Sequence, residues 1–205
     1  METKILFRER RSVTFFNKDR DINDQLLEEI INLAVEAPSA FNLQPWRIIV
    51  VKTEENRQKL FKLANQQDKV LEAPVTLIII GNKEGYSEKN PVWTEMLQSV
   101  GGDEQMVSGA KEAAAFLYGS SDERKLKFAE SNAGLLSMAI MIAAKEFGVD
   151  SHPMSGIDFD GIHKEFDLTE GESVVMTISL GFYDESRQLY PRRPRRLFKE
   201  ITTVV

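Results

Sequence analysis

Residues 37–47 read APSAFNLQPWR, and this stretch decides how the rest of the chain is interpreted. It lies between a segment with helical spacing and an apolar run that is typical of a buried strand. Two prolines bracket small and amide side chains, which favours a turn whose backbone is shaped to meet a ligand. The alternative is a stiffened connection between two elements, because most loops only connect. The neighbouring segments have to decide between the two.

The segments around this loop have clear periodicities. In chain order they predict a helix from Ile22 that Pro38 ends, a strand over 46–51, a helix over 53–64 and a strand over 75–80. Asn23 is placed to cap the first helix. Strands separated by helices indicate an α/β or α+β sandwich around a central sheet.

The second half of the chain starts with a weaker pattern. Glycines and scattered aromatic residues between Gly81 and Ser121 predict a partly helical excursion, which suits a lid, a packing insertion or a dimer contact equally well. The remaining elements are the longest helix over 122–147 with a capping box at its start and Gly148 as its stop, a short turn over 152–158, a helix over 159–166 capped by Asp158, and a strand over 173–180.

Composition excludes several classes of function. The chain has 205 residues, 42% of them apolar and 28% charged, which is typical of one globular domain. A net charge of -6 argues against nucleic acid as a partner. Cysteine is absent, and only His152 and His163 could serve a metal centre or a serine triad, so we expect neither. No apolar run has the length of a signal or membrane segment, so we expect a cytoplasmic protein without membrane contact.

Positive charge is concentrated at the two ends of this acidic chain. A short helix predicted over 5–11 ends in a basic cluster beside Ser12, and residues 192–196 hold four arginines. Guanidinium groups next to a hydroxyl are well suited to bind phosphate, because the arginine fork makes charge-assisted hydrogen bonds. The alternative for the N-terminal cluster is a solvated basic turn.

Taken in order, these pieces resemble the nitroreductase family over essentially the whole chain. The matching pieces are Arg10-Arg11-Ser12-Val13, the loop from Ala37 to Trp46, the Gln-rich turn before Ala73-Pro74, the run from Pro153 to Asp158, and the basic tail. The resemblance implies an α+β three-layer sandwich with a mostly antiparallel sheet flanked by helices. It also implies an intertwined homodimer with one FMN in each of two interface pockets. Residues 1–205 would form one domain, with a helical lid or excursion over about 82–120 and a C-terminal extension over about 184–205.

The resemblance assigns residues to FMN position by position. The first and last pieces contribute Arg10, Arg11, Ser12, Thr14, Arg193 and Arg195. Arg10 and Ser12 match phosphate-side positions, and Arg196 is an alternative partner because the spacing of the tail is shifted by one. The loop residues that would reach the flavin of the partner subunit are Pro38, Ser39, Ala40 and Asn42.

Two further segments are assigned to the flavin ring. Gln66 and Lys69 match positions at the pyrimidine edge, with Gln67 as an alternative. The turn that would pass the N5 side, with a backbone N–H as donor, consists of Pro153, Met154, Ser155 and Gly156. Two positions depart from the family pattern. Thr14 stands where arginine or lysine is usual, and Ser155 stands where an acidic or amide residue is common, which bears on flavin potential and substrate preference.

The implied activity is an FMN-dependent oxidoreductase. Hydride would pass from NADH or NADPH through FMN to a small oxidised acceptor such as a nitroaromatic or quinone, in ping-pong kinetics. Flavin chemistry needs no protein nucleophile, which agrees with the absence of cysteine. We expect the acceptor to lie between Phe41 and aromatic residues of the excursion. The alternatives are an FMN-binding or sensory protein with little turnover, for which Thr14 is the hint, and a flavin-free dimer of the same fold.

Overall fold

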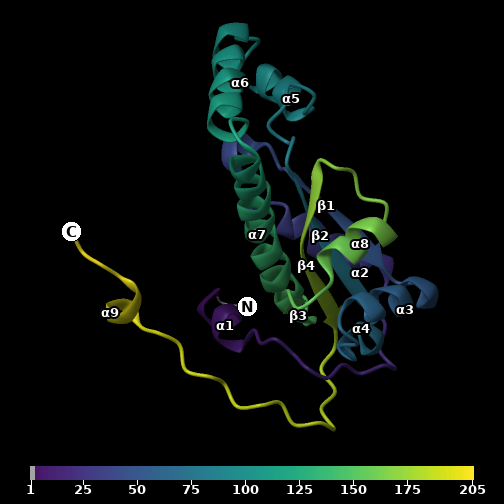
Figure 1. The fold of residues 1–205 in the computed structure, drawn as a ribbon. Helices are drawn as coiled ribbons and strands as arrows, with labels where there is room; N and C mark the ends of the chain where they lie inside the picture. The colour runs from purple at the N-terminus through teal and green to yellow at the C-terminus, as the bar shows by residue number, and fades with distance from the viewer. Residues whose placement is uncertain (1–2) are drawn as a thin grey trace.

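A four-stranded antiparallel sheet in the order β1-β2-β4-β3 lies at the centre of the protein (Figure 1). The computed structural model describes residues 3–205. Its strands are β1 Trp46–Val51, β2 Val75–Asn82, β3 Asp150–Met154 and β4 Glu172–Gly181. Strand β2 pairs with β1 on one side and with β4 on the other, and it is buried along nearly its whole length. The predicted mostly antiparallel sheet of an α+β fold is therefore confirmed.

Helices cover both faces of the sheet and make three layers. On one face lie α2 Asp24–Ala34 and α7 Asp122–Glu146, and on the other lie α3 Glu54–Leu63, α4 Lys69–Glu72 and α8 Phe159–Glu165. The first core is built on Leu77, Ile79 and Ile178, and the second on Ile78 and Ile80. Alternation along β2 therefore sends successive side chains into different cores.

Local capping explains why the main helices begin and end where they do. The side chain of Ser121 accepts a hydrogen bond from the Arg124 N–H at the start of α7, and Gly148 follows its end with a φ of 74°. Asn23 caps α2 as predicted, accepting from the Leu26 N–H. The prediction that Pro38 ends this helix is wrong, because α2 already stops at Ala34.

The excursion between β2 and α7 forms two helices, α5 Val92–Ser99 and α6 Glu104–Tyr118. It has a small core of its own, in which Trp93 and Val107 pack against Leu43 of the opening loop and Phe128 of α7. In Figure 1 these helices extend beyond the end of the sheet. The outer side of α6 exposes Phe116 to 75%. Its role as a lid stays a prediction.

Three local predictions need correction. Residues 152–158 do not form only a turn, because β3 runs through Pro153 to Met154. Strand β3 is the edge of the sheet, where a proline without an N–H is tolerated. The polar patch before Ala73 contains an additional helix, α4. Finally, α1 covers Thr3–Glu9 and ends before the arginines at 10 and 11.

The C-terminal segment leaves the body of the protein after β4. It extends away from the sheet to a short helix, α9 Phe198–Ile201, whose apolar side chains are exposed (Figure 1). None of the helices within residues 3–205 has both the length and the apolar character needed to cross a membrane.

A glycine on β2 marks the closest approach of the sheet to α7. A Cβ added at Gly81 would lie 2.9 Å from the Ala129 backbone carbonyl carbon, whereas one added at Gly109 in α6 meets nothing within 4 Å. We therefore expect Gly81→Ala to lower the free energy of unfolding by about 1–3 kcal/mol through overpacking. Gly109→Ala should raise it by up to about 1 kcal/mol through helix propensity. Urea unfolding followed by circular dichroism measures both, and a Gly81→Ala midpoint equal to wild type would contradict the prediction.

Candidate functional site

The N-terminal segment completes the open edge of the sheet and so enters the site. Ser12 forms a parallel bridge to Ser151, and the Val13 N–H donates to the Ser151 carbonyl at 3.0 Å. Further along, Phe16 pairs with Tyr183, just after β4. These contacts place the segment around Arg10 beside β3 and near the root of the C-terminal tail.

Arg10 lies half-buried in the middle of a basic cavity. Its Nη1 is buried and has no hydrogen-bond partner among the described residues. Burial, followed by the positive charges of Arg195 and Arg192, lowers the pKa of Arg10. A half-buried guanidinium with an unused donor among like charges is well suited to bind an anion.

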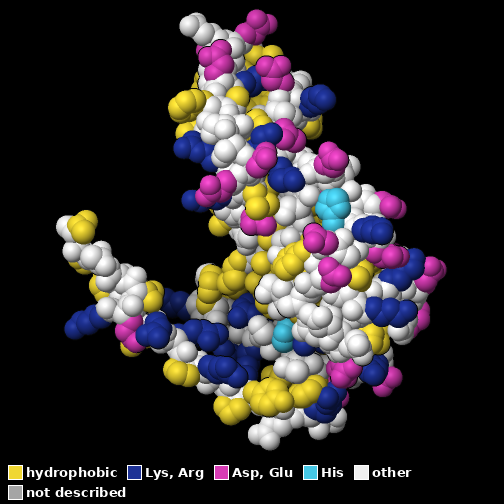
Figure 2. Space-filling model, in the orientation of Figure 1, with side chains coloured by type: hydrophobic (Ala, Val, Ile, Leu, Met, Phe, Trp, Pro, Cys, Tyr) yellow, Lys and Arg dark blue, Asp and Glu magenta, His cyan; other side chains and the backbone are white. Residues whose placement is uncertain are grey.

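The cavity around Arg10 has a volume of about 770 Å³. Figure 2 shows Lys and Arg side chains gathered between the body and the C-terminal tail. The lining comes from both ends of the chain and from Met138 of α7: Phe7, Arg8, Arg10, Arg11, Ser12, Thr14, Met138, Leu189, Tyr190, Pro191, Arg192, Arg193 and Arg195. The structure thus brings together all six residues predicted for the first and last pieces.

Not every arginine near this cavity is free for a ligand. Arg11 donates to the Tyr190 carbonyl, and Arg192 donates to the Glu9 carbonyl at 3.0 Å. Arg196 does not line the cavity and instead pairs with Glu200 of α9 at 3.4 Å. Between the two arrangements that the sequence left open, the structure favours the arginines at 193 and 195 over Arg196.

The polar turn before α4 is tied to the turn after β3. The side chains of Asn65 and Gln67 both donate to the Gly156 carbonyl, at 2.9 and 3.1 Å. Lys69 in turn donates to Gln67 Oε1 at 3.1 Å. Burial lowers the pKa of Lys69, against the opposing charges of Asp68 and Glu72. Gln67, and not Gln66, joins this network through its side chain, because Gln67 both donates to Gly156 and accepts from Lys69.

Residues 153–156 continue from β3 into this network. Met154 is buried in the second core, whereas Ser155 and Gly156 are exposed. The side chains of Asn65 and Gln67 fix the turn through its Gly156 carbonyl. The backbone of the turn is therefore fixed while its outer side stays accessible.

His152 is the residue that the sequence interpretation did not place. Its Nδ1 lies 2.7 Å from the Val13 carbonyl, so the ring joins β3 to the N-terminal segment. Burial, and to a smaller extent the charge of Lys69, lowers the pKa of His152, although the bond to Val13 opposes the shift. A histidine flanking the Pro153 turn was the only available signal.

The opening loop is strained and held from several sides. Phe41, Asn42 and Gln44 have φ angles of 52°, 55° and 46°. The Ala40 N–H donates to Asn132 Oδ1 and the Gln44 N–H to Ser39 Oγ, both at 2.9 Å. The Ser39 hydroxyl therefore shapes the loop itself. Pro38, Ser39, Ala40 and Asn42 are not among the residues that line the basic cavity.

Phe41 belongs to an aromatic cluster of the excursion. Its ring centroid lies 6.4 Å from that of Trp93 and 6.2 Å from that of Tyr118, which itself stacks on Phe128 at 4.4 Å. Phe41 thus joins the loop to α5, α6 and α7. Whether the same ring bounds an acceptor stays a prediction.

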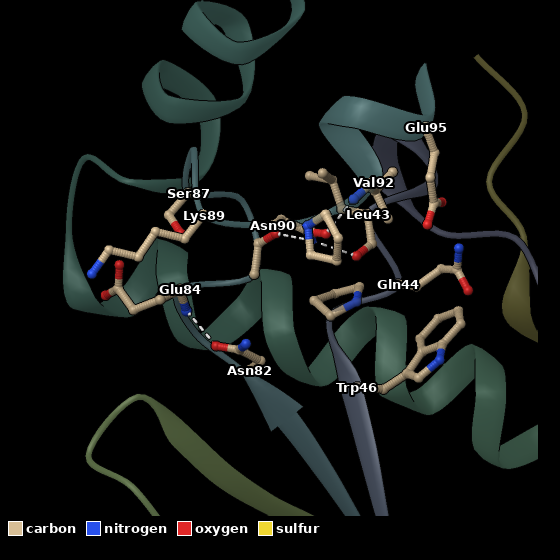
Figure 3. A pocket seen from close by; sticks show the side chains of 13 residues that line it. Leu43, Gln44, Trp46, Asn82, Glu84, Ser87, Lys89, Asn90, Val92 and Glu95 are labelled. Atoms are coloured by element: carbon tan, nitrogen blue, oxygen red, sulfur yellow. Dashed lines mark hydrogen bonds between the residues drawn. The ribbon is translucent and has the colours of Figure 1, made fainter. Parts of the chain in front are cut away.

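A second cavity of about 540 Å³ adjoins the carboxyl end of the loop (Figure 3). Figure 3 shows Glu84 and Lys89 on one side and Glu95 with Trp46 on the other. Asn90 crosses between the walls and donates to the carbonyls of Leu43 and Gly85, at 2.8 and 2.6 Å. Acidic and basic side chains both line this second cavity, so the cavity around Arg10, which is lined by arginines, is the better candidate for an anionic ligand.

The root of the tail is fastened to α4. Glu72 is buried and accepts hydrogen bonds from Arg187 at 2.9 Å and from the Phe16 N–H at 3.3 Å. The Arg187 guanidinium also stacks on Phe15, 3.6 Å from the ring centroid. Helix α4 therefore begins with Lys69 of the polar network and ends with Glu72, which holds the start of the arginine-rich tail through Arg187.

Comparisons with known proteins agree with this architecture. The model of the Nitroreductase family matches residues 7–182. The chain is 30% identical over 202 residues to a candidate NAD(P)H nitroreductase of Bacillus subtilis, MhqN, and the match covers 98% of this chain and 96% of that protein.

Two solved structures illustrate the same likeness. The crystal structure of a candidate nitroreductase of Bacillus subtilis, ydfN, superposes with a TM-score of 0.91 at 30% identity, over 100% of this chain and 99% of the other. A candidate nitroreductase from Exiguobacterium sibiricum, solved in complex with FMN, superposes with a TM-score of 0.81 at 24% identity, over 95% and 94% of the two chains.

The shifted pKa of His152 predicts a stability that depends on pH. Its folded-state pKa lies below the ordinary value of 6.5, so the unfolded chain takes up the proton first as the pH falls. The contribution of the neutral ring is present above the unfolded pKa and is lost as the pH falls from about 6.5 through the folded pKa. Between about pH 7.5 and pH 5, the free energy of unfolding measured with urea should therefore fall more for wild type than for His152→Asn. An NMR titration with the His152 midpoint at or above 6.5 would contradict the shift.

Proposed function

The chain belongs to the nitroreductase family, whose named relatives are NAD(P)H-dependent oxidoreductases, and we propose that it transfers hydride from NADH or NADPH through bound FMN to a small oxidised acceptor. The observation that carries the proposal is the basic cavity, in which the buried Nη1 of Arg10 has no partner. When bound, FMN supplies the redox chemistry, taking up two electrons as hydride from the nicotinamide and giving them to the acceptor.

The donor set of the cavity fits the phosphate end of FMN. Arg10, Arg193 and Arg195 supply charge-assisted donors, and Ser12 adds a short neutral one. Burial lowers the pKa of Arg10 first, and the charges of Arg195 and Arg192 lower it further; a phosphate that enters the cavity would offset both effects. Arg11 and Arg192 hold the surrounding backbone, so in this proposal they act mainly by shaping the cavity.

The flavin ring would lie over the network of Gln67, Lys69 and Gly156. A lysine ammonium beside the pyrimidine edge stabilises the negative charge that the cofactor takes up on reduction. Thr14 brings no second cation, so Lys69 would carry this task with less help than is usual in the family. Met154 and Ser155 would place a backbone N–H next to the reacting side of the ring.

The opening loop would serve the partner subunit of a homodimer. Two features support a dimer: α7 exposes Leu135 to 48% in its middle, and the tail exposes Phe198 to 68%. Large apolar side chains left uncovered on a helix and on an extended arm are expected to be buried by another chain. Pro38, Ser39, Ala40 and Asn42 would then complete the partner's site, since they do not reach the cavity of their own subunit. Sedimentation equilibrium tests the dimer, and a monomer at micromolar concentration would contradict it.

Donor and acceptor would use the same exposed face in turn. This arrangement gives ping-pong kinetics, with a nitroaromatic or a quinone as the acceptor class and the aromatic cluster around Phe41 as its neighbour. The donors NADH and NADPH occur in the cytoplasm, where we propose that the protein acts. The family fold alone does not select the acceptor.

The direct test of this function is spectroscopic. We expect the purified protein to bind FMN with a visible flavin band, and we expect anaerobic NADH or NADPH to bleach it within the time of turnover. Addition of a quinone or nitroaromatic should restore the band. Bound FMN that neither NADH nor NADPH reduces would support the alternative of a flavin-binding protein with little turnover. No FMN binding at micromolar concentration would overturn the proposal.

The two arginines at 195 and 196 offer a matched test of the phosphate site. Arg195 lines the cavity, whereas Arg196 pairs with Glu200 outside it. Arg195→Ala should raise the FMN dissociation constant about tenfold or more, because a hydrogen bond to a charged group is worth about 1.5–3 kcal/mol. Arg196→Ala should change it less than about threefold, since exposed ion pairs contribute little. Flavin fluorescence titration measures both, and the reverse order would assign the phosphate contact to Arg196.

A further inference from the structure

His152 joins two segments that the proposed function places at opposite ends of FMN. Its Nδ1 is 2.7 Å from the Val13 carbonyl, beside Ser12 of the phosphate end. On its other side the chain continues directly into Pro153 and the ring-end turn. A carbonyl oxygen only accepts, so the Nδ1 must carry the hydrogen.

The bond made by His152 is one of two that fix this junction. The Val13 N–H donates to the Ser151 carbonyl at 3.0 Å, and the imidazole then holds the Val13 carbonyl. Both polar groups of one peptide residue are thereby fastened to β3. The strand ends at Met154, and two residues further on Gln67 donates to the Gly156 carbonyl and accepts a hydrogen bond from Lys69. A continuous set of contacts therefore runs from the phosphate end to the ring end.

We propose that His152 is a positioning residue that sets the separation between segment 10–14 and turn 153–156. The inference rests on the proposed function, because it takes FMN as the ligand that spans the two segments. FMN contacts both ends at once, so the phosphate adds to the affinity only when the two ends are held at a matching distance. Riboflavin lacks the phosphate and senses the ring end alone.

The neutral state of the ring supports this role. Burial and the charge of Lys69 keep the pKa of His152 low, so the ring is uncharged at neutral pH. A single donor then remains at Nδ1 and is aimed at Val13. The interaction is a neutral hydrogen bond that fixes the position of Val13 relative to β3, and it adds no charge to the flavin site.

A purely structural role is the competing explanation, and the second histidine provides its control. His163 in α8 likewise contacts a backbone carbonyl, that of Thr169, with Nε2 at 3.0 Å. It lies beside a different cavity and touches neither of the two flavin segments. Removing its hydrogen bond would show how much a histidine bond to a backbone carbonyl affects flavin binding when it lies away from the two flavin segments.

The experiment compares FMN with riboflavin binding in four full-length proteins. His152→Asn keeps an amide donor at the position of Nδ1, whereas His152→Gln moves the donor out by one methylene. We expect His152→Gln to raise the FMN dissociation constant about tenfold, which is the size of one lost neutral hydrogen bond. The riboflavin dissociation constant should rise less than about twofold. His152→Asn should recover most of the FMN affinity. His163→Gln should leave both constants within about twofold of wild type.

The ratio of the two constants separates the explanations. An equal loss of FMN and riboflavin affinity in His152→Gln, or no loss of either, would overturn the positioning role. So would a His152→Asn protein as weak as His152→Gln. Thermal unfolding checks that each variant folds, and His152→Asn still decides the question if His152→Gln does not. Wild type that fails to bind FMN would overturn the proposed function as well, whereas FMN binding with an unchanged ratio would overturn this inference alone.

Discussion

The hydrogen bond from Val13 to the Ser151 carbonyl is the contact on which the site depends. Strand β3 is the edge of the sheet, so its outer backbone groups need partners, and the segment around Ser12 supplies them. This pairing carries Arg10 into the space beside β3. The same segment then meets the end of β4, where the tail begins. The N-terminal segment thus pairs with the edge strand and also meets the start of the C-terminal tail.

Electrostatics at this junction explain why the site is local in an acidic protein. The chain carries a net charge of -6, yet among residues 3–205 no carboxylate lines the cavity around Arg10, and the charges of Arg195 and Arg192 add to burial in lowering the pKa of Arg10. Elsewhere a buried charge is paired: Glu72 holds Arg187 at 2.9 Å. Repulsion between like charges is costly in a partly buried site. Because like charges are gathered in this cavity while the buried charge of Glu72 is paired, an anionic ligand is a better interpretation of the cavity than a solvated basic surface.

Features set by a few neighbouring residues could be predicted from the sequence. The cap at Asn23 and the strands through 46–51 and 75–80 follow local patterns, and the structure confirms them. The capping box predicted at the start of the longest helix is replaced by a simple cap, in which Ser121 accepts a hydrogen bond from the Arg124 N–H. Strand β3 could not be predicted in this way, because Pro153 reads as a turn unless the sheet order is known. The choice between Gln66 and Gln67 depends on side-chain direction at positive φ, and the role of His152 depends on a carbonyl far away in sequence. Family resemblance supplied the site segments, but their mutual contacts needed the fold.

Backbone strain adds an argument that is independent of charge. Left-handed residues other than glycine, asparagine and aspartate cost about 1–2 kcal/mol each. Positive φ angles outside glycine occur at Phe41, Asn42 and Gln44 and again at Asn65 and Gln66, with Asp167 as the one other case among the described residues, so the strain lies mainly at Phe41, Gln44 and Gln66. A loop that only joined α2 to β1 could relax, but the bonds at Ala40 and Gln44 prevent it. Strain that surrounding contacts maintain is typical of functional loops. The two strained segments are those that the proposed function assigns to the flavin, so under that proposal the opening loop would keep its conformation because it contacts the cofactor of the partner subunit.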